Sequence, residues 1–168
     1  MKIICLLVLS NLLVFAAHAE VVEATPDHYL LNHEAVSVLS HHDMWERLTS
    51  PSLWWNPDHT YSGDSANLTL ELHAGGLWRE DWADGSVAHG TVLSVSNGRQ
   101  LRLAAPFGPL QEMAVETIWT ITVVAEGEGS RVTFVEFTSG NASSNLDEIA
   151  PAVDFVKGEA LRRLVADM

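Results

Sequence analysis

Two acid–base side chains fall among apolar residues of predicted strands, and His89 is the first. It shares one strand face with Val87, Leu93 and Val95, because alternate residues of a strand point to the same side. If that face is concave, the imidazole projects into an apolar space, where it could bind a carbonyl or carboxylate or act as a general base. The simpler interpretation is a histidine satisfied by a neighbouring side chain or facing solvent.

Glu136 poses the same question on a later strand. It lies between Phe134 and Thr138 in the alternating pattern. Burial would raise the pKa of a carboxyl group there and make it a candidate acid, with Tyr61 as the alternative. Alternation does not say which strand face is inside, so the catalytic residues stay unknown.

Other charged side chains suggest less chemistry. Glu71, Glu80 and Asp81 are interpreted as solvated charges at a sheet edge. His42 and Glu46 are four residues apart and would share a helix face, but zinc needs a third protein ligand and no further ligand follows at a suitable spacing. We therefore expect no metal and no cofactor.

Six tryptophans are many for 168 residues. Each indole buries roughly 150–250 Å², so part of the set belongs to the core, and the rest could line a ligand cavity. Trp54 and Trp55 are adjacent, so at least one is expected at a cavity mouth or on the surface, whereas Trp119 is expected at the cavity floor. The candidates for the cavity wall are Trp54, Trp55, Tyr61, Trp78, His89, Leu93, Met113, Trp119, Phe134 and Val156.

The amino-terminal segment is typical of a secretory signal peptide. A basic start and a mostly apolar run over residues 3–17 lead to the small-residue pattern Ala17-His18-Ala19. The run is shorter than the ~20 residues of a membrane span. We expect residues 1–19 to be removed near Ala19 and the protein to be exported, to a periplasm or the exterior. The mature chain would then lack cysteine, because Cys5 is the only one.

The composition restricts the classes of molecule that the protein is expected to bind. The chain has 22 acidic and 9 basic residues and a formal charge of −13. Nucleic acid and anionic membrane surfaces are therefore disfavoured, since both require clustered Lys and Arg. With 47% apolar and 18% charged residues, the composition is that of a chain that folds, and the length suits one domain.

The elements that must position these residues follow from hydrophobic periodicity. Residues 20–28 are interpreted as a flexible lead-in, and residues 29–39 alternate as a strand. Two short helical segments follow, and about six antiparallel strands then run between residues 67 and 138, with Asn97-Gly98 as the strongest hairpin signal. One of these strands is expected over 113–125.

The tail is predicted to be an amphipathic helix. Its apolar residues recur at three- and four-residue spacing, and Pro151 either begins or kinks it. Asp154 and Glu159 are placed on its wet side. The predicted fold is α+β, of the helix-grip type: a curved antiparallel sheet of about seven strands wrapped around a long C-terminal helix, with two short helices after the first strand.

The order of motifs over 29–168 resembles the START-like, or SRPBCC, superfamily, and within it the branch named after activators of the heat-shock-90 ATPase. No single motif is specific; their order carries the resemblance. The matching stretches are Met44-Trp45-Glu46-Arg47, Leu53-Trp54-Trp55-Asn56-Pro57, Leu72-His73-Ala74-Gly75-Gly76-Leu77-Trp78, Asp84-Gly85, His89-Gly90-Thr91-Val92-Leu93, Trp119-Thr120-Ile121 and Val132-Thr133-Phe134.

The resemblance implies a hydrophobic cavity between sheet and helix that holds a lipid or another apolar small molecule. The superfamily shares no catalytic set, so no catalytic residue transfers. Chaperone activation does not suit an exported protein, because the chaperone and its ATP are intracellular. Three functions remain: binding an apolar small molecule without catalysis, cyclase- or dehydratase-type catalysis with His89 as base, and protein interaction.

Overall fold

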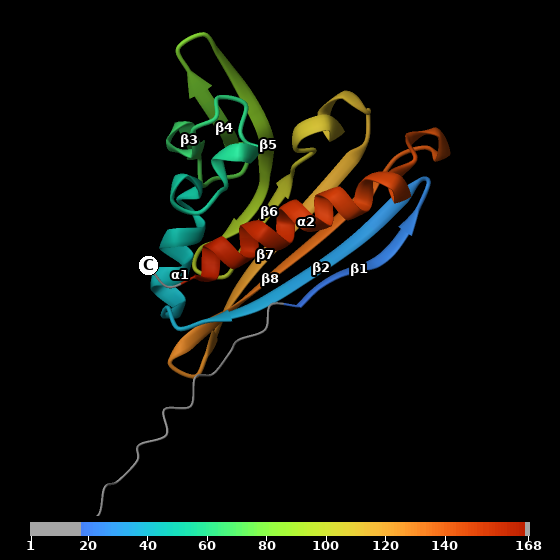
Figure 1. The fold of residues 1–168 in the computed structure, drawn as a ribbon. Helices are drawn as coiled ribbons and strands as arrows, with labels where there is room; N and C mark the ends of the chain where they lie inside the picture. The colour runs from blue at the N-terminus through green and yellow to red at the C-terminus, as the bar shows by residue number, and fades with distance from the viewer. Residues whose placement is uncertain (1–17, 167–168) are drawn as a thin grey trace, which may run out of the picture.

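Eight antiparallel strands form one open sheet, and a long C-terminal helix crosses one of its faces (Figure 1). The computed structural model describes residues 18–166. The strand order is β1-β2-β8-β7-β6-β5-β4-β3. The strands are β1 (His18–Thr25), β2 (His28–Ser37), β3 (Leu68–Leu70), β4 (Leu77–Trp82), β5 (Gly85–Ser96), β6 (Gln100–Ala104), β7 (Glu116–Glu126) and β8 (Gly129–Ser139).

The expected architecture is present, but the sheet has eight strands where about seven were expected. The strands from β3 to β8 are consecutive neighbours, as the alternation and the turn signals predicted, and β8 then pairs with β2. The eighth strand is β1, which occupies most of the segment interpreted as a flexible lead-in. Its pairing with β2 skips Val22, and this bulge interrupts the alternation by which a strand is recognised. The expected signal peptide lies for the most part outside the described residues.

The helical insertion after β2 also differs from the two short helices expected. One α-helix, α1 (His41–Leu48), is followed by three 3-10 helices: η1 (Pro51–Leu53), η2 (Pro57–His59) and η3 (Ser65–Asn67). Ser40 caps α1 by accepting a hydrogen bond from the Asp43 amide. Pro51 and Pro57 each open a 3-10 turn, where the missing proline amide is not needed.

The strand expected over 113–125 begins three residues later. Residues Gly108–Glu112 form η4, and Met113 follows it with near-helical backbone angles. Ala114 then takes a left-handed conformation with φ of 52°, which redirects the chain into β7. Met113 is therefore not part of that strand face.

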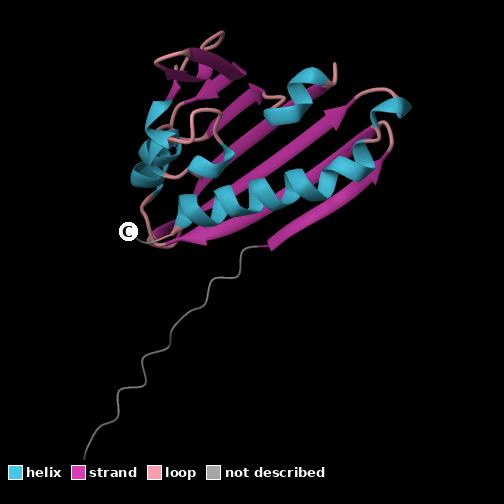
Figure 2. Cartoon of the chain, turned by 45° about the horizontal axis from the view of Figure 1, so that its top comes forward, coloured by secondary structure: helices cyan, strands magenta, loops and turns pink. Residues whose placement is uncertain are grey.

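The helix α2 (Leu146–Val165) lies across the sheet beside β1, β2 and β8 (Figure 2). It begins five residues before Pro151, so this proline lies inside the helix. No helix within residues 18–166 is both long and apolar enough to span a membrane. A fifth 3-10 helix, η5 (Ala142–Ser144), precedes α2.

Arg47 ties α1 to the end of α2. Its guanidinium donates to the carbonyl oxygens of Ala166 at 2.7 Å and Arg163 at 2.9 Å. Positive charge at a helix C-terminus also complements the helix dipole. The two helices are thereby fixed relative to each other at one end of the sheet, where the aromatic core begins.

Most of the indoles form a continuous aromatic core under that end. Trp54, Trp78 and Trp119 are at most 1% exposed. Trp78 meets Trp54 edge-on at 5.8 Å between ring centroids, and Trp119 meets Phe134 edge-on at 5.0 Å. Such contacts add roughly 0.5–1.5 kcal/mol each beyond the burial of area. This core makes a rigid wall next to the candidate site.

Candidate functional site

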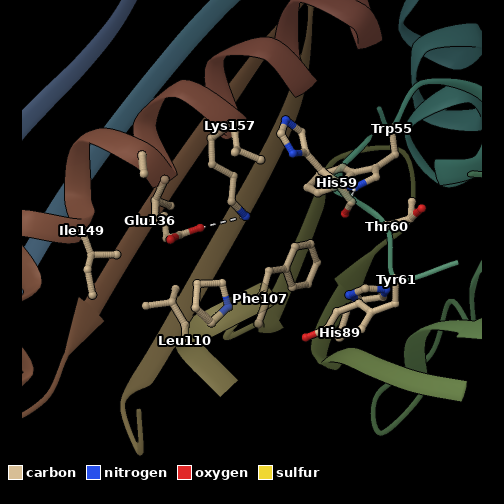
Figure 3. Close-up of a pocket in the computed structure, with 16 residues that line it drawn as sticks. Trp55, His59, Thr60, Tyr61, His89, Phe107, Leu110, Glu136, Ile149 and Lys157 are labelled. Atoms are coloured by element: carbon tan, nitrogen blue, oxygen red, sulfur yellow. Dashed lines mark hydrogen bonds and ion pairs between the residues drawn. The ribbon is translucent and has the colours of Figure 1, made fainter. Parts of the chain in front are cut away.

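A cavity of about 420 Å³ lies between α2, the sheet and the loops that follow α1 and β6 (Figure 3). Its lining is mainly apolar and aromatic, with a few polar side chains. The lining residues are Trp55, His59, Thr60, Tyr61, His89, Ala105, Phe107, Gly108, Pro109, Leu110, Glu136, Ile149, Ala152, Val153, Val156 and Lys157.

The helix α2 supplies one wall through its apolar stripe. Ile149, Val153 and Val156 recur at three- and four-residue spacing and line the cavity. They are only partly buried, whereas Leu161 and Leu164 further along the same stripe are buried in the aromatic core. The stripe therefore packs tightly at its C-terminal end and faces open space in its middle.

A buried ion pair forms the polar part of the cavity. The Lys157 Nζ atom of α2 lies 2.8 Å from Glu136 Oε2 of β8, and the side chains are 3% and 2% exposed. The Tyr29 hydroxyl of β2 donates to Glu136 Oε1 at 2.7 Å. Burial, together with the negative charge of Glu136, raises the pKa of Tyr29 above its usual range. Tyr29 thus remains a neutral donor.

Two aromatic rings lie against the lysine ammonium. The Nζ atom lies 3.3 Å from the centroid of the Trp119 ring and 4.6 Å from that of Phe107. Both distances are within the range of a cation–π interaction. Burial lowers the pKa of Lys157, and Glu136 opposes that effect. Figure 3 shows the side chain reaching from α2 towards Glu136 and Phe107.

A second acid–base pair lines the cavity at His89. Its Nε2 atom lies 3.0 Å from Glu80 Oε2, and the two side chains are 5% and 0% exposed. The backbone amides of Tyr61 and Ser62 donate to the Glu80 carboxylate at 3.0 and 2.5 Å. Burial alone would raise the pKa of Glu80, but these donors and His89 outweigh it, and the pKa is lowered. Burial lowers the pKa of His89.

Glu80 corrects the interpretation of a solvated edge charge. The strand β4 is the second strand from the sheet edge, but the loop after η2 folds over it and donates its amides to this carboxylate. The pairing of β4 with β5 skips His89, which makes His89 the extra residue of a bulge. Bulges re-aim side chains, and strict alternation does not anticipate where they point.

The rim formed by the loop after α1 is pinned to α2. Glu159 accepts from the Asn56 side chain at 2.9 Å and lies 3.0 Å from the His59 ring. The Arg163 guanidinium donates to the Trp54 carbonyl at 2.9 Å. Hydrogen bonding from Asn56, and then from His59, lowers the pKa of Glu159. Glu159 therefore holds the rim instead of being a purely solvated charge.

Of the ten sequence candidates, four line the cavity: Trp55, Tyr61, His89 and Val156. Four others, Trp54, Trp78, Trp119 and Phe134, lie behind it in the core. Leu93 is 45% exposed, because it is the extra residue of a second bulge in β5. Met113 packs with the small cluster around Tyr29 and Leu110.

The sequence interpretation missed Lys157, His59 and Phe107. Lys157 was detectable, because it falls four residues after Val153 and four before Leu161 on the apolar stripe. The positions of His59 and Phe107 depend on loop conformations that no local pattern encodes. Within residues 18–166, no three His, Cys, Asp or Glu side chains gather as a metal site would require.

No family model and no curated protein matches the chain. Solved structures share its fold at low sequence identity. A protein from Rhodobacter sphaeroides has a TM-score of 0.58 at 18% identity, over 88% of this chain and 96% of that one. CalU16 from Micromonospora echinospora, in solution, has a TM-score of 0.59 at 15% identity, over 90% and 73%. A conserved protein of unknown function from Enterococcus faecalis has a TM-score of 0.55 at 13% identity, over 90% and 77%.

Proposed function

We propose that this protein is an exported START-like helix-grip domain that binds one apolar small molecule or single-chain lipid in the cavity beside α2. The observation that carries the proposal is a cavity of about 420 Å³ with a largely apolar lining and a buried polar pair in its wall. Small-molecule sites commonly have volumes of roughly 300–1,000 Å³ and few, well-placed polar groups.

The polar pair favours a neutral ligand. Lys157 already has Glu136 as its counter-ion at 2.8 Å. An anionic ligand would bring a second negative charge to a site that is compensated, and a cation would meet the lysine. A hydroxyl or carbonyl group could instead share these polar partners, with its hydrocarbon part against Ile149, Val153 and Val156.

The test is a binding experiment with a matched pair of helix variants. Val156→Trp places an indole in the cavity, whereas Phe155→Trp changes the neighbouring position, which is 62% exposed. Native mass spectrometry with medium-chain alcohols and aldehydes should show one bound molecule in the wild type and in Phe155→Trp, whereas fatty acids of the same chain length, which are anionic, should bind more weakly. Binding should be lost in Val156→Trp. If no such compound binds the wild type, the proposal is wrong.

A second candidate function, proton-transfer catalysis, is favoured by His89 and Glu80. A buried imidazole with a carboxylate 3.0 Å from Nε2, in a cavity wall, has the arrangement of an oriented general base. It would remove a proton from carbon next to a ligand carbonyl. NMR detection of deuterium exchange at that carbon in D₂O, lost in His89→Gln, would support catalysis. An equal exchange rate in both proteins would exclude this role.

Export is part of the same proposal and has its own test. Expression in a secreting host should yield a chain that begins at Glu20, as determined by amino-terminal sequencing of the exported fraction. A chain that stays inside the cell with Met1 in place would contradict it.

A further inference from the structure

Lys157 is the one lysine among residues 18–166, and its side chain is buried. Of the nine basic residues, only Lys2 and Lys157 are lysines; the other basic residues are all arginines. Lys2 lies outside the described residues. An arginine stays protonated in proteins, whereas a buried lysine can lose its proton and become a nucleophile. Among the lysine and arginine side chains of residues 18–166, the one that lines the cavity is thus the one that can form a covalent bond to a ligand.

The Lys157 amine has hydrogen-bonding capacity that the described residues do not use. Its contact with Glu136 is close, at 2.8 Å, but within residues 18–166 the Nζ atom has no acceptor in hydrogen-bond geometry. An ammonium carries three N–H donors. Buried donors are nearly always satisfied, so an exception at a cavity wall indicates a group that a ligand completes.

We infer that Lys157 forms an imine with the carbonyl carbon of an apolar aldehyde or ketone held in the cavity. This inference rests on the proposed binding function and specifies its ligand class. The hydrocarbon part of the ligand would lie along Ile149, Val153 and Val156, which places its carbonyl end near Lys157 on the same helix. Phe107, 4.6 Å from Nζ, covers the amine and must turn aside for the carbonyl to reach it.

The reaction balances without any further reagent. Lys157 gives a proton to Glu136, the neutral nitrogen adds to the carbonyl carbon, and one of its two remaining N–H protons passes to the oxygen to give the carbinolamine. The protonated Glu136 then supplies the proton that lets the carbinolamine oxygen leave as water. The sum is ammonium plus carbonyl giving protonated imine plus water, and nothing is oxidised or reduced. The positive charge stays beside Glu136 and over the Trp119 ring. Burial also lowers the pKa of Lys157, which increases the neutral fraction.

The test uses nonanal as the probe and cyanoborohydride to reduce any imine that forms. Intact mass should rise by the mass of one nonanal minus one oxygen atom, and peptide mapping should place the adduct on Lys157. An excess of nonanol, which can fill the cavity but cannot form an imine, should slow this labelling. Mapping also separates any reaction at the amino-terminal amine.

An exposed lysine provides the matched control in the same molecule. Arg99 is exposed, so Arg99→Lys offers a solvated amine beside the buried one. We expect Lys157 to be labelled at least about tenfold faster than the lysine introduced at position 99, because proximity and a neutral amine favour the cavity. Phe107→Ala should accelerate labelling further, and Lys157→Arg should abolish it while circular dichroism shows a native fold.

The outcomes separate this inference from the function on which it rests. If nonanol binds but Lys157 stays unlabelled, or is labelled no faster than position 99, the imine is excluded and the binding function stands. If neither nonanol nor nonanal binds, the binding function itself fails.

Discussion

The Lys157–Glu136 pair places two opposite charges in the buried wall of the cavity. Breaking such a pair costs roughly 3–5 kcal/mol, because the remaining charge loses its partner. We expect Glu136→Gln to lower the free energy of unfolding by about that amount, with Lys157→Met costing less because Tyr29 still donates to Glu136. The double variant should cost less than the sum of the two, as measured by urea unfolding.

The control for this cycle is the exposed pair of His42 and Glu46, at 77% and 66% exposed. The corresponding double-mutant cycle should give a coupling energy of less than about 1 kcal/mol. Additive effects at Lys157 and Glu136 would show that the two charges do not interact in solution.

Two buried histidines should make stability depend on pH. Burial lowers the pKa of His33, next to Asp154 and Lys157, and of His89, next to Glu80, below the ordinary 6.5. For each histidine, at pH values between the folded pKa and the unfolded pKa, the unfolded chain binds more protons than the folded chain. The stabilisation is therefore complete above pH 6.5 and is lost as the pH falls through the folded pKa, with a slope of at most about 1.4 kcal/mol per pH unit for each histidine.

Urea unfolding at pH 7.0, 6.0 and 5.5 measures this dependence. The wild type should lose stability steadily towards low pH, and His33→Gln with His89→Gln should show a flatter curve. The same slope in both proteins would mean that other groups are responsible.

For single residues, the sequence predicted which side chains belong to the cavity better than it predicted their interaction partners. His89 and Glu136 were recognised as candidates from alternation, and both line the cavity. Their partners were not identified, because Glu80 and Lys157 reach them across different elements. A long-range contact of this kind leaves no periodic signal in either segment.

Among the elements, α1 and α2 depend on Arg47 for their relative position. Arg47→Ala removes two hydrogen bonds from a charged donor to the last carbonyls of α2. Hydrogen bonds to charged groups contribute roughly 1.5–3 kcal/mol, so we expect a loss in that range. Hydrogen exchange should accelerate in residues 161–166. The control Arg99→Ala, on an exposed turn, should change neither the stability nor the exchange rate. An unaltered exchange rate in Arg47→Ala would show that Arg47 does not hold the two helices together.

Periodicity predicted the elements well where they were regular. The six-strand meander and the tail helix follow the alternating and helical patterns closely. Irregular elements were missed for a common reason: the bulges at Val22, His89 and Leu93 each insert one residue and invert the apparent face of the strand beyond. The chain between α1 and β3 takes its shape from prolines and from contacts with α2.

For the whole molecule, β1 should contribute to stability although it was interpreted as a lead-in. It pairs along β2, and Val21 packs against the cluster that contains Tyr29. A chain that begins at Glu20, the expected mature terminus, is the reference. One that begins at Pro26 should lose roughly 2 kcal/mol, equivalent to a Tm lower by about 4–8 °C. Differential scanning calorimetry tests this, and equal Tm values would support the lead-in interpretation.

The overall architecture was accessible from sequence because its order of elements leaves few ways to cover one apolar sheet face. The cavity was accessible only as an expectation. Its volume depends on where the loops after α1 and β6 settle, and His59 and Phe107 reach it from those loops.

The open sheet has two outer strands, and they are protected from self-association differently. The strand β3 spans three residues, which offers little backbone to a second molecule. The strand β1 spans eight, but its bulge at Val22 interrupts the regular ladder that fibre growth requires, and Glu23 is an exposed charge beside that bulge. Removing Val22 while neutralising Glu23 would recreate a flat template, so this short segment would be the place where the protein becomes prone to amyloid-like stacking.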